Sequence, residues 1–195
     1  TGNDNTALGK DAMSANTTGA SNVAVGKGAL DANTTATENT AVGTNSLGGN
    51  TTGSYNTALG NQTLLANTTG TKNVALGLNA LTTNTTASNN VAVGADALKV
   101  NTTGTGNVAV GSLVLDANTT GDSNTAIGHE SLSGNTTGQR NVSLGLGSMY
   151  TNSTGNYNVA LGYASLTANT TADNNIAVGY LALTANTTGH RNTAL

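Results

Sequence analysis

Side chains that could do acid–base, nucleophilic or metal chemistry are few in this chain and stand far apart. The 195 residues include two histidines, His129 and His190, and no cysteine. A metal site needs several ligands that converge on one point, and a serine nucleophile such as Ser143 needs a base beside it. The glycines do not form the G-x-x-x-x-G-K-[ST] sequence of a phosphate-binding loop. We therefore expect no enzyme activity, with no catalytic residue, no metal and no cofactor.

A different chemistry, N-linked glycosylation, is indicated by Asn-Thr-Thr tripeptides (once Asn-Ser-Thr) that recur along the chain. They match the acceptor sequence Asn-x-Ser/Thr, as do Asn61 and Asn141. Two interpretations are open: a column of glycans, or a turn whose Asn and Thr side chains form internal hydrogen bonds. We favour the turn, because an inward-facing Asn cannot carry a sugar. The candidate acceptors are Asn16, Asn33, Asn50, Asn67, Asn84, Asn101, Asn118, Asn135, Asn152, Asn169 and Asn186.

The spacing of these tripeptides belongs to a 17-residue repeat that covers the whole chain. Its start, Asn-[Thr/Val/Ile]-Ala-[Leu/Val/Ile]-Gly with one Ser in place of Ala, occurs at residue 5 and then every 17 residues to residue 192, without insertion or deletion. Positions are counted from this first Asn, so Asn22 is at position 1 and Asn33 at position 12. Such periods are typical of solenoids, whose units bury apolar faces against their neighbours. We predict an all-β parallel β-solenoid with one repeat per coil, continuous over residues 1–195.

Positions 2–4 predict a short strand in each coil, because β-branched residues and Leu lead into a Gly. Side-chain alternation places positions 2 and 4 on one face and position 3 on the other. Position 3 is Ala in all copies but one, and small side chains permit the close approach of another chain. We predict an interchain contact stripe at position 3 in a cyclic homo-oligomer. Its residues are Ala7, Ala24, Ala41, Ala58, Ala75, Ala92, Ala109, Ala126, Ser143, Ala160, Ala177 and Ala194.

The second half of the repeat supplies another core column at position 9, which is always Leu or Met. Periodicity does not decide whether this segment is a second strand or one turn of helix, and we lean towards strand. All charged residues, both histidines and all tyrosines fall at positions 6, 7, 10, 16 and 17, which we expect to form the solvated surface. Asp96 and Glu130 share position 7 but lie about 10 Å apart at the usual strand spacing, too far for a paired acid–base site.

The composition argues against several classes of partner. A net charge of −3 with 8% charged residues provides no basic stripe for nucleic acid. No apolar run approaches the roughly 18 residues that cross a bilayer, and we expect any targeting segment to lie outside these residues. The strict period argues against the disorder that such a composition otherwise suggests. Both ends fall within a repeat, so we expect a window of a longer array.

The motif Asn22–Gly26, repeated at fixed intervals and followed by a small residue such as Ala29, resembles the head repeats of YadA-like trimeric autotransporter adhesins and related phage tail-fibre repeats. That resemblance implies a left-handed parallel β-roll, assembly of three chains, and an extracellular adhesive or spacer rod. The repeat here is longer than the usual adhesin repeat, because the Asn-Thr-Thr-Gly segment enlarges each coil.

These observations predict a non-enzymatic structural or adhesive fibre segment at a cell surface, in the extracellular space or on a virion. Its expected partner is itself, as a homotrimer, with a host-surface or matrix ligand as a second candidate; no nucleic acid or membrane contact is expected. One alternative is a self-assembling filament subunit, glycosylated or not, whose open coil ends stack. Another is an ice-binding solenoid that uses the Thr-Thr columns. We disfavour it, because ice binding needs outward Thr on a flat strand face clear of bulky neighbours, whereas these Thr sit beside turn residues.

Overall fold

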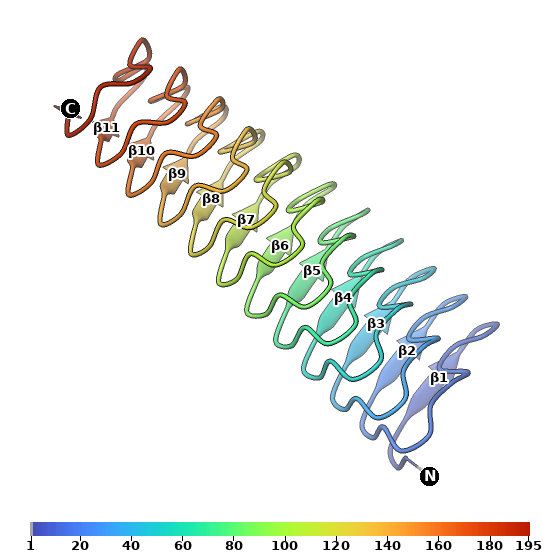
Figure 1. Cartoon of the computed structure of the whole chain (residues 1–195). Helices are drawn as coiled ribbons and strands as arrows, with labels where there is room; N and C mark the ends of the chain where they lie inside the picture. Colours follow the sequence, from blue (N-terminus) through green and yellow to red (C-terminus); the bar gives the residue numbers. More distant parts are fainter. Residues whose placement is uncertain (1) are drawn as a thin grey trace.

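The computed structural model describes residues 2–195 as a rod of stacked coils, and each coil contributes one short strand to a single parallel sheet. The chain ends lie at opposite ends of the rod (Figure 1). The strands follow one another in sequence order: β1 (Thr6–Leu8), β2 (Val23–Val25), β3 (Thr40–Val42), β4 (Thr57–Leu59), β5 (Val74–Leu76), β6 (Val91–Val93), β7 (Val108–Val110), β8 (Thr125–Ile127), β9 (Val142–Leu144), β10 (Val159–Leu161), β11 (Ile176–Val178) and β12 (Thr193–Ala194).

Equivalent positions of successive repeats lie side by side in the sheet. Val91 pairs with Val108 and Ala92 with Ala109, and the same offset of one repeat holds for every strand pair. Parallel strands need a long connection between them, usually a helix. Here the rest of the repeat makes that connection, and the described residues contain no helix. The predicted parallel solenoid with one 17-residue repeat per coil is confirmed.

The second half of each repeat is neither strand nor helix, so our preference for a second strand was wrong. In the coil that begins at Asn73, the backbone has positive φ at Gly77 (121°), Asn79 (55°) and Leu81 (52°). These left-handed residues reverse the chain direction repeatedly, which an extended strand cannot do. The turns are joined from coil to coil by backbone hydrogen bonds, for example from Leu81 N–H to the Ala97 carbonyl at 3.0 Å.

A buried column of Leu and Met at position 9 runs along the rod, as predicted. Leu98, Leu115 and Leu132 are fully buried, and all members of the column have φ near +50°. A left-handed conformation costs a residue with a Cβ about 1–2 kcal/mol, whereas full burial of a Leu side chain contributes about 1.5–3 kcal/mol. Packing therefore outweighs backbone strain at this position.

Small residues at positions 3 and 8 complete the interior. Ala92, Ala97 and Ala109 are fully buried and belong to the same apolar core as the Leu column. Where position 8 is Ser, the hydroxyl is hydrogen-bonded inside the rod. Ser46 Oγ donates to the Ala58 carbonyl of the next coil at 2.9 Å, and Ser165 Oγ donates to the Gly162 carbonyl of its own coil at 3.1 Å. The core is thin, one large side chain per coil, and each coil depends on its neighbours for burial.

The Gly at position 5 is required for two reasons: its backbone φ is positive, and the next coil leaves no room for a side chain. Gly94 has φ 134°, and a Cβ built on it would lie 2.2 Å from the Gly111 carbonyl oxygen of the next coil. No side chain fits there unless the coils separate. By contrast, Gly147 at position 7 has φ 62° and open space around its Cβ direction. Other coils carry non-Gly residues with positive φ at position 7, such as Asp96 and Glu130.

We predict that Gly94→Ala lowers the free energy of unfolding by roughly 3–5 kcal/mol, because the added methyl group collides with the next coil. Gly147→Ala, the matched control, should cost only about 1–2 kcal/mol, the price of a left-handed Ala. Chemical denaturation followed by circular dichroism measures both. Equal losses for the two variants would contradict the assigned coil contact.

Candidate functional site

The chemistry-bearing side chains lie apart on the surface. His129 Nδ1 is 3.7 Å from Glu130 Oε2 on an exposed edge, and His190 Nδ1 accepts a hydrogen bond from Asp173 N–H at 2.9 Å. Asp96 pairs with Lys99 at 3.2 Å. Within residues 2–195 no three His, Asp or Glu side chains are grouped as metal ligands, and the surface has no pocket.

Ser143 lies in the interior and takes part in a hydroxyl network. Its Oγ donates to the Ser148 carbonyl at 2.9 Å and accepts from Ser131 Oγ at 2.7 Å. The residue is fully buried. Its hydroxyl is thus satisfied by one partner in its own coil and one in the preceding coil, as expected for a polar replacement of Ala inside a core.

The prediction of an interchain contact stripe at position 3 was wrong, because these side chains point into the coil and not outward. Ala24, Ala41, Ala58, Ala75, Ala92, Ala109, Ala126, Ser143, Ala160 and Ala177 are fully buried within one chain. Ala7 and Ala194 belong to the terminal coils and are exposed and half-buried, respectively. The physical reason is space, because the interior already holds a Leu column and two Asn columns, and only a methyl group fits between them and the strand.

The candidate glycosylation column at position 12 also faces inward. Asn33, Asn50, Asn67, Asn84, Asn101, Asn118, Asn135, Asn152 and Asn169 are fully buried, and Asn16 and Asn186 in the outer coils are half-buried. Their Nδ2 atoms, where a sugar would be attached, donate hydrogen bonds within the rod. Glycans along this column are incompatible with the folded coils. The preferred interpretation, a turn with internal hydrogen bonds, is confirmed.

Two buried Asn columns tie neighbouring coils together. Asn107 Nδ2 donates to the Gly121 carbonyl at 2.8 Å, and Asn107 Oδ1 accepts from Asn124 N–H at 2.9 Å. Asn118 Nδ2 donates to the same Gly121 carbonyl at 3.1 Å and to Asn101 Oδ1 at 2.9 Å. Among the described residues every buried side-chain nitrogen and oxygen atom has a partner. The ladder therefore adds stability and fixes the register.

The outward side of the sheet is an apolar surface, here called the strand face, made by positions 2 and 4. Position 2 is Thr, Val or Ile and position 4 is Leu, Val or Ile in every coil, without one charged residue. Val91, Val93, Val108 and Val110 are half-buried in the single chain, and Ile127 is 41% exposed. Monomeric proteins rarely leave a continuous apolar surface of this length in water.

The chain returns to the next strand along the other side of the core, through positions 11–15, here called the return segment. Its Asn at position 12 and Gly or Ala at position 15 face inward. Thr102 at position 13 is half-buried, and its hydroxyl donates to the Thr119 carbonyl at 3.0 Å. Thr103 at position 14 is exposed, like its equivalents in every other coil.

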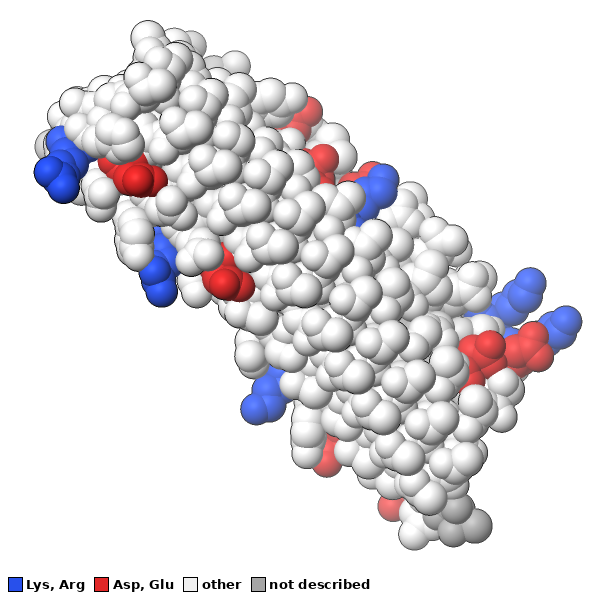
Figure 2. Space-filling model, viewed as in Figure 1, with Lys and Arg blue, Asp and Glu red and all other residues white. Residues whose placement is uncertain are grey.

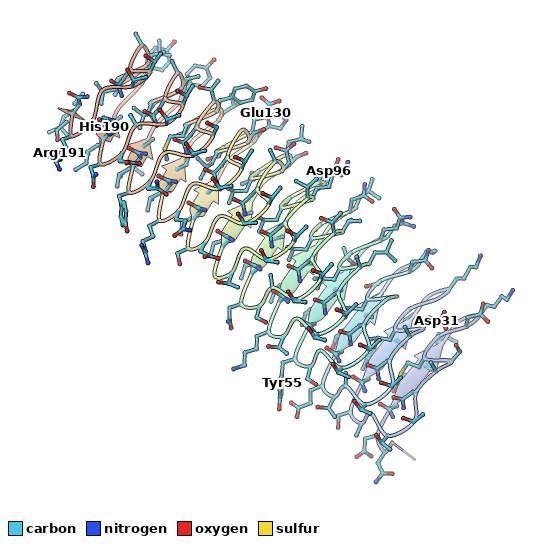
Figure 3. All side chains as sticks on the ribbon, viewed as in Figure 1. Asp31, Tyr55, Asp96, Glu130, His190 and Arg191 are labelled. Carbon is cyan, nitrogen blue, oxygen red and sulfur yellow. The ribbon has the colours of Figure 1, made fainter. Side chains whose placement is uncertain are left out.

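The charged residues lie along the two long edges between these surfaces. Figure 2 shows Lys, Arg, Asp and Glu along both edges of the visible face, with none in its middle. Asp31, Asp96 and Glu130 mark one edge, and Tyr55 and Arg191 mark the other (Figure 3). No charged residue among residues 2–195 is buried, so the predicted solvated positions are confirmed.

A search of protein families, curated proteins and solved structures found no match to this chain. The resemblance to YadA-like head repeats therefore stays a prediction. No helix within residues 2–195 is long and apolar enough to cross a membrane.

We predict that Asn107→Ala destabilises the rod by roughly 2–5 kcal/mol, because the Gly121 carbonyl loses a donor and Asn124 N–H loses its acceptor inside the core. Asn61→Ala, at an exposed position 6, should change stability by less than about 0.5 kcal/mol. Thermal and denaturant unfolding compare the two. A small effect of Asn107→Ala would show that the ladder contributes little.

Proposed function

We propose that this chain is a non-enzymatic rod segment of an extracellular fibre, built from identical chains that pack side by side through their strand faces. The observation that carries the proposal is the strand face itself, two outward columns of Val, Ile, Leu and Thr that continue through all coils without a charge. Burying such a surface is favourable at about 25 cal/mol per Å² of apolar area. An interface whose core lacks charged residues is typical of homo-oligomers.

Another copy of the chain is the partner that matches this face along its length. The face repeats once per coil, because Ala92 pairs with Ala109 and every other strand pair keeps this offset. A rotation axis parallel to the rod brings equivalent coils of several chains to the same height, so each coil makes the same contact. An unrelated partner would need the same period over the same distance. Assembly of three chains and the extracellular location are what the adhesin resemblance implies.

The work of such a fibre is to hold other parts of the molecule away from a surface and to present weak contacts many times over. The edges are suited to contacts with a host-surface or matrix ligand, because residue type there changes from coil to coil. Exposed aromatic side chains lie on them, including Tyr55 and Tyr180. In a side-by-side assembly through the strand face, these edges stay in contact with solvent.

We predict that Val110→Lys, at position 4 near the middle of the strand face, disrupts self-association. An ammonium group buried among apolar side chains is unpaired, so the dissociation constant of the assembly should rise by at least about tenfold. Ser123→Lys adds the same charge at an exposed edge position and should leave association unchanged. Sedimentation velocity at several concentrations measures the mass of each variant, and circular dichroism verifies that the coils remain folded. A wild-type chain that stays monomeric at all concentrations would refute the proposal.

A further inference from the structure

One exposed column of the rod does not vary, although the other fully solvated positions do. Position 14 is Thr in every repeat from Thr18 to Thr188, and each of these residues is exposed. Positions 6, 7, 10, 16 and 17 accept charged, aromatic, amide and aliphatic side chains in the same chain. Elsewhere in the coil, uniform positions are buried or form a turn. Position 14 also lies in a bend of the return segment, but it is exposed in every repeat.

Hydrogen bonding within the rod does not explain the uniform hydroxyl. At position 13 the Thr hydroxyl is used, since Thr102 Oγ1 donates to the Thr119 carbonyl and this bond recurs along the column. At position 14 no hydroxyl between residues 2 and 195 has a hydrogen bond to the protein.

The column is evenly spaced and is flanked by small side chains. The backbone N–H groups of Thr102 and Thr103 both donate to the Thr119 carbonyl of the next coil, at 2.9 and 3.3 Å. Equivalent Thr residues therefore recur once per coil, about 4.8 Å apart at the usual strand spacing. Position 15 is Gly or Ala, position 11 is Ala, Gly, Thr or Val, and the return segment has no charged residue. A flat surface can thus approach the whole column.

We infer that the position-14 column binds ice. Each Thr presents a hydroxyl that can join a water lattice and a methyl group that displaces disordered water. The coil spacing is close to the repeat of oxygen rows in hexagonal ice. A small ligand would need only a few coils, whereas a crystal surface makes the same weak contact with every coil, and many such contacts add up. Thr is branched at Cβ, so little side-chain freedom is lost on binding.

This inference is independent of the proposed assembly. The return segment lies on the other side of the core from the strand face (Figure 1), so the Thr column stays exposed whether the chain is monomeric or packed with its copies. The Thr residues of position 14 lie in a bend and not on a strand. The residues beside them at positions 11 and 15 are small, however, and the bulky side chains lie on the edges.

The test is retention of fluorescently labelled chain by a slowly grown ice hemisphere, together with the shape of ice crystals in its presence. The wild-type chain should be taken up into ice and should shape crystals. Thr103→Tyr/Thr120→Tyr, which places two rings over the column in adjacent coils, should reduce uptake by at least about tenfold. Gly106→Tyr/Ser123→Tyr is the matched control, because position 17 already holds Tyr55 and Tyr157, and it should bind like wild type.

Circular dichroism melting of both double variants verifies that the rod is folded. Exclusion of the wild-type chain from ice would overturn the inference. Equal uptake of wild type and the Thr103→Tyr/Thr120→Tyr variant would overturn it as well, because binding would then not use this column. Neither result depends on the mass measured for the assembly.

Discussion

The hydrogen-bonded contact between identical backbone positions of successive coils is the constraint from which the other features follow. Parallel strand pairing fixes three residues per coil, but most of each coil is turn, and short turns of this kind have little stability alone. The buried Asn side chains supply the missing order. Asn107 and Asn118 both donate to the Gly121 carbonyl and close one coil, while bonds such as that from Asn118 Nδ2 to Asn101 Oδ1 join it to the neighbouring coil. Buried amides that are fully hydrogen-bonded specify one register, whereas unpaired amides would be costly.

The buried columns determine which residues of each coil face outward. Because Leu at position 9 and the two Asn columns occupy the coil, the strand can direct only Ala inward and must direct positions 2 and 4 outward. The return segment likewise turns Asn and Gly inward and leaves one Thr in solvent. A thin core thus produces two uncharged outer surfaces of different chemistry, one aliphatic and one hydroxylated, and the charged residues remain at the edges where the chain turns.

The sequence predicted the period, the parallel strands, the Leu column and the solvated positions, because each is a property of a column and needs no knowledge of shape. It did not predict which strand face points inward. Alternation places Ala92 on one face of the strand and Val91 and Val93 on the other, but it does not tell which of the two faces is buried. The exchange of Thr and Val at position 2 does not break that symmetry, because the buried position 8 also accepts both Thr63 and Val114.

The turns were beyond sequence reasoning for another reason. Leu81 and Leu98 adopt left-handed conformations that residues with a branched side chain seldom adopt, and only the packing of the coil compensates for this strain. The inward orientation of the position-12 Asn residues followed from their uniformity, but the shared acceptor at Gly121 depends on how the coil closes in three dimensions.

The constant offset between coils also has a genetic consequence. Since every unit meets its neighbours through the same atoms, unequal recombination between the near-identical DNA segments that encode them would lengthen or shorten the rod by whole layers and leave each outer surface unbroken. A gain or loss of one codon inside a unit would instead interrupt every column at that layer. The length of the rod can therefore evolve in steps of one coil, and the structure of each coil stays the same.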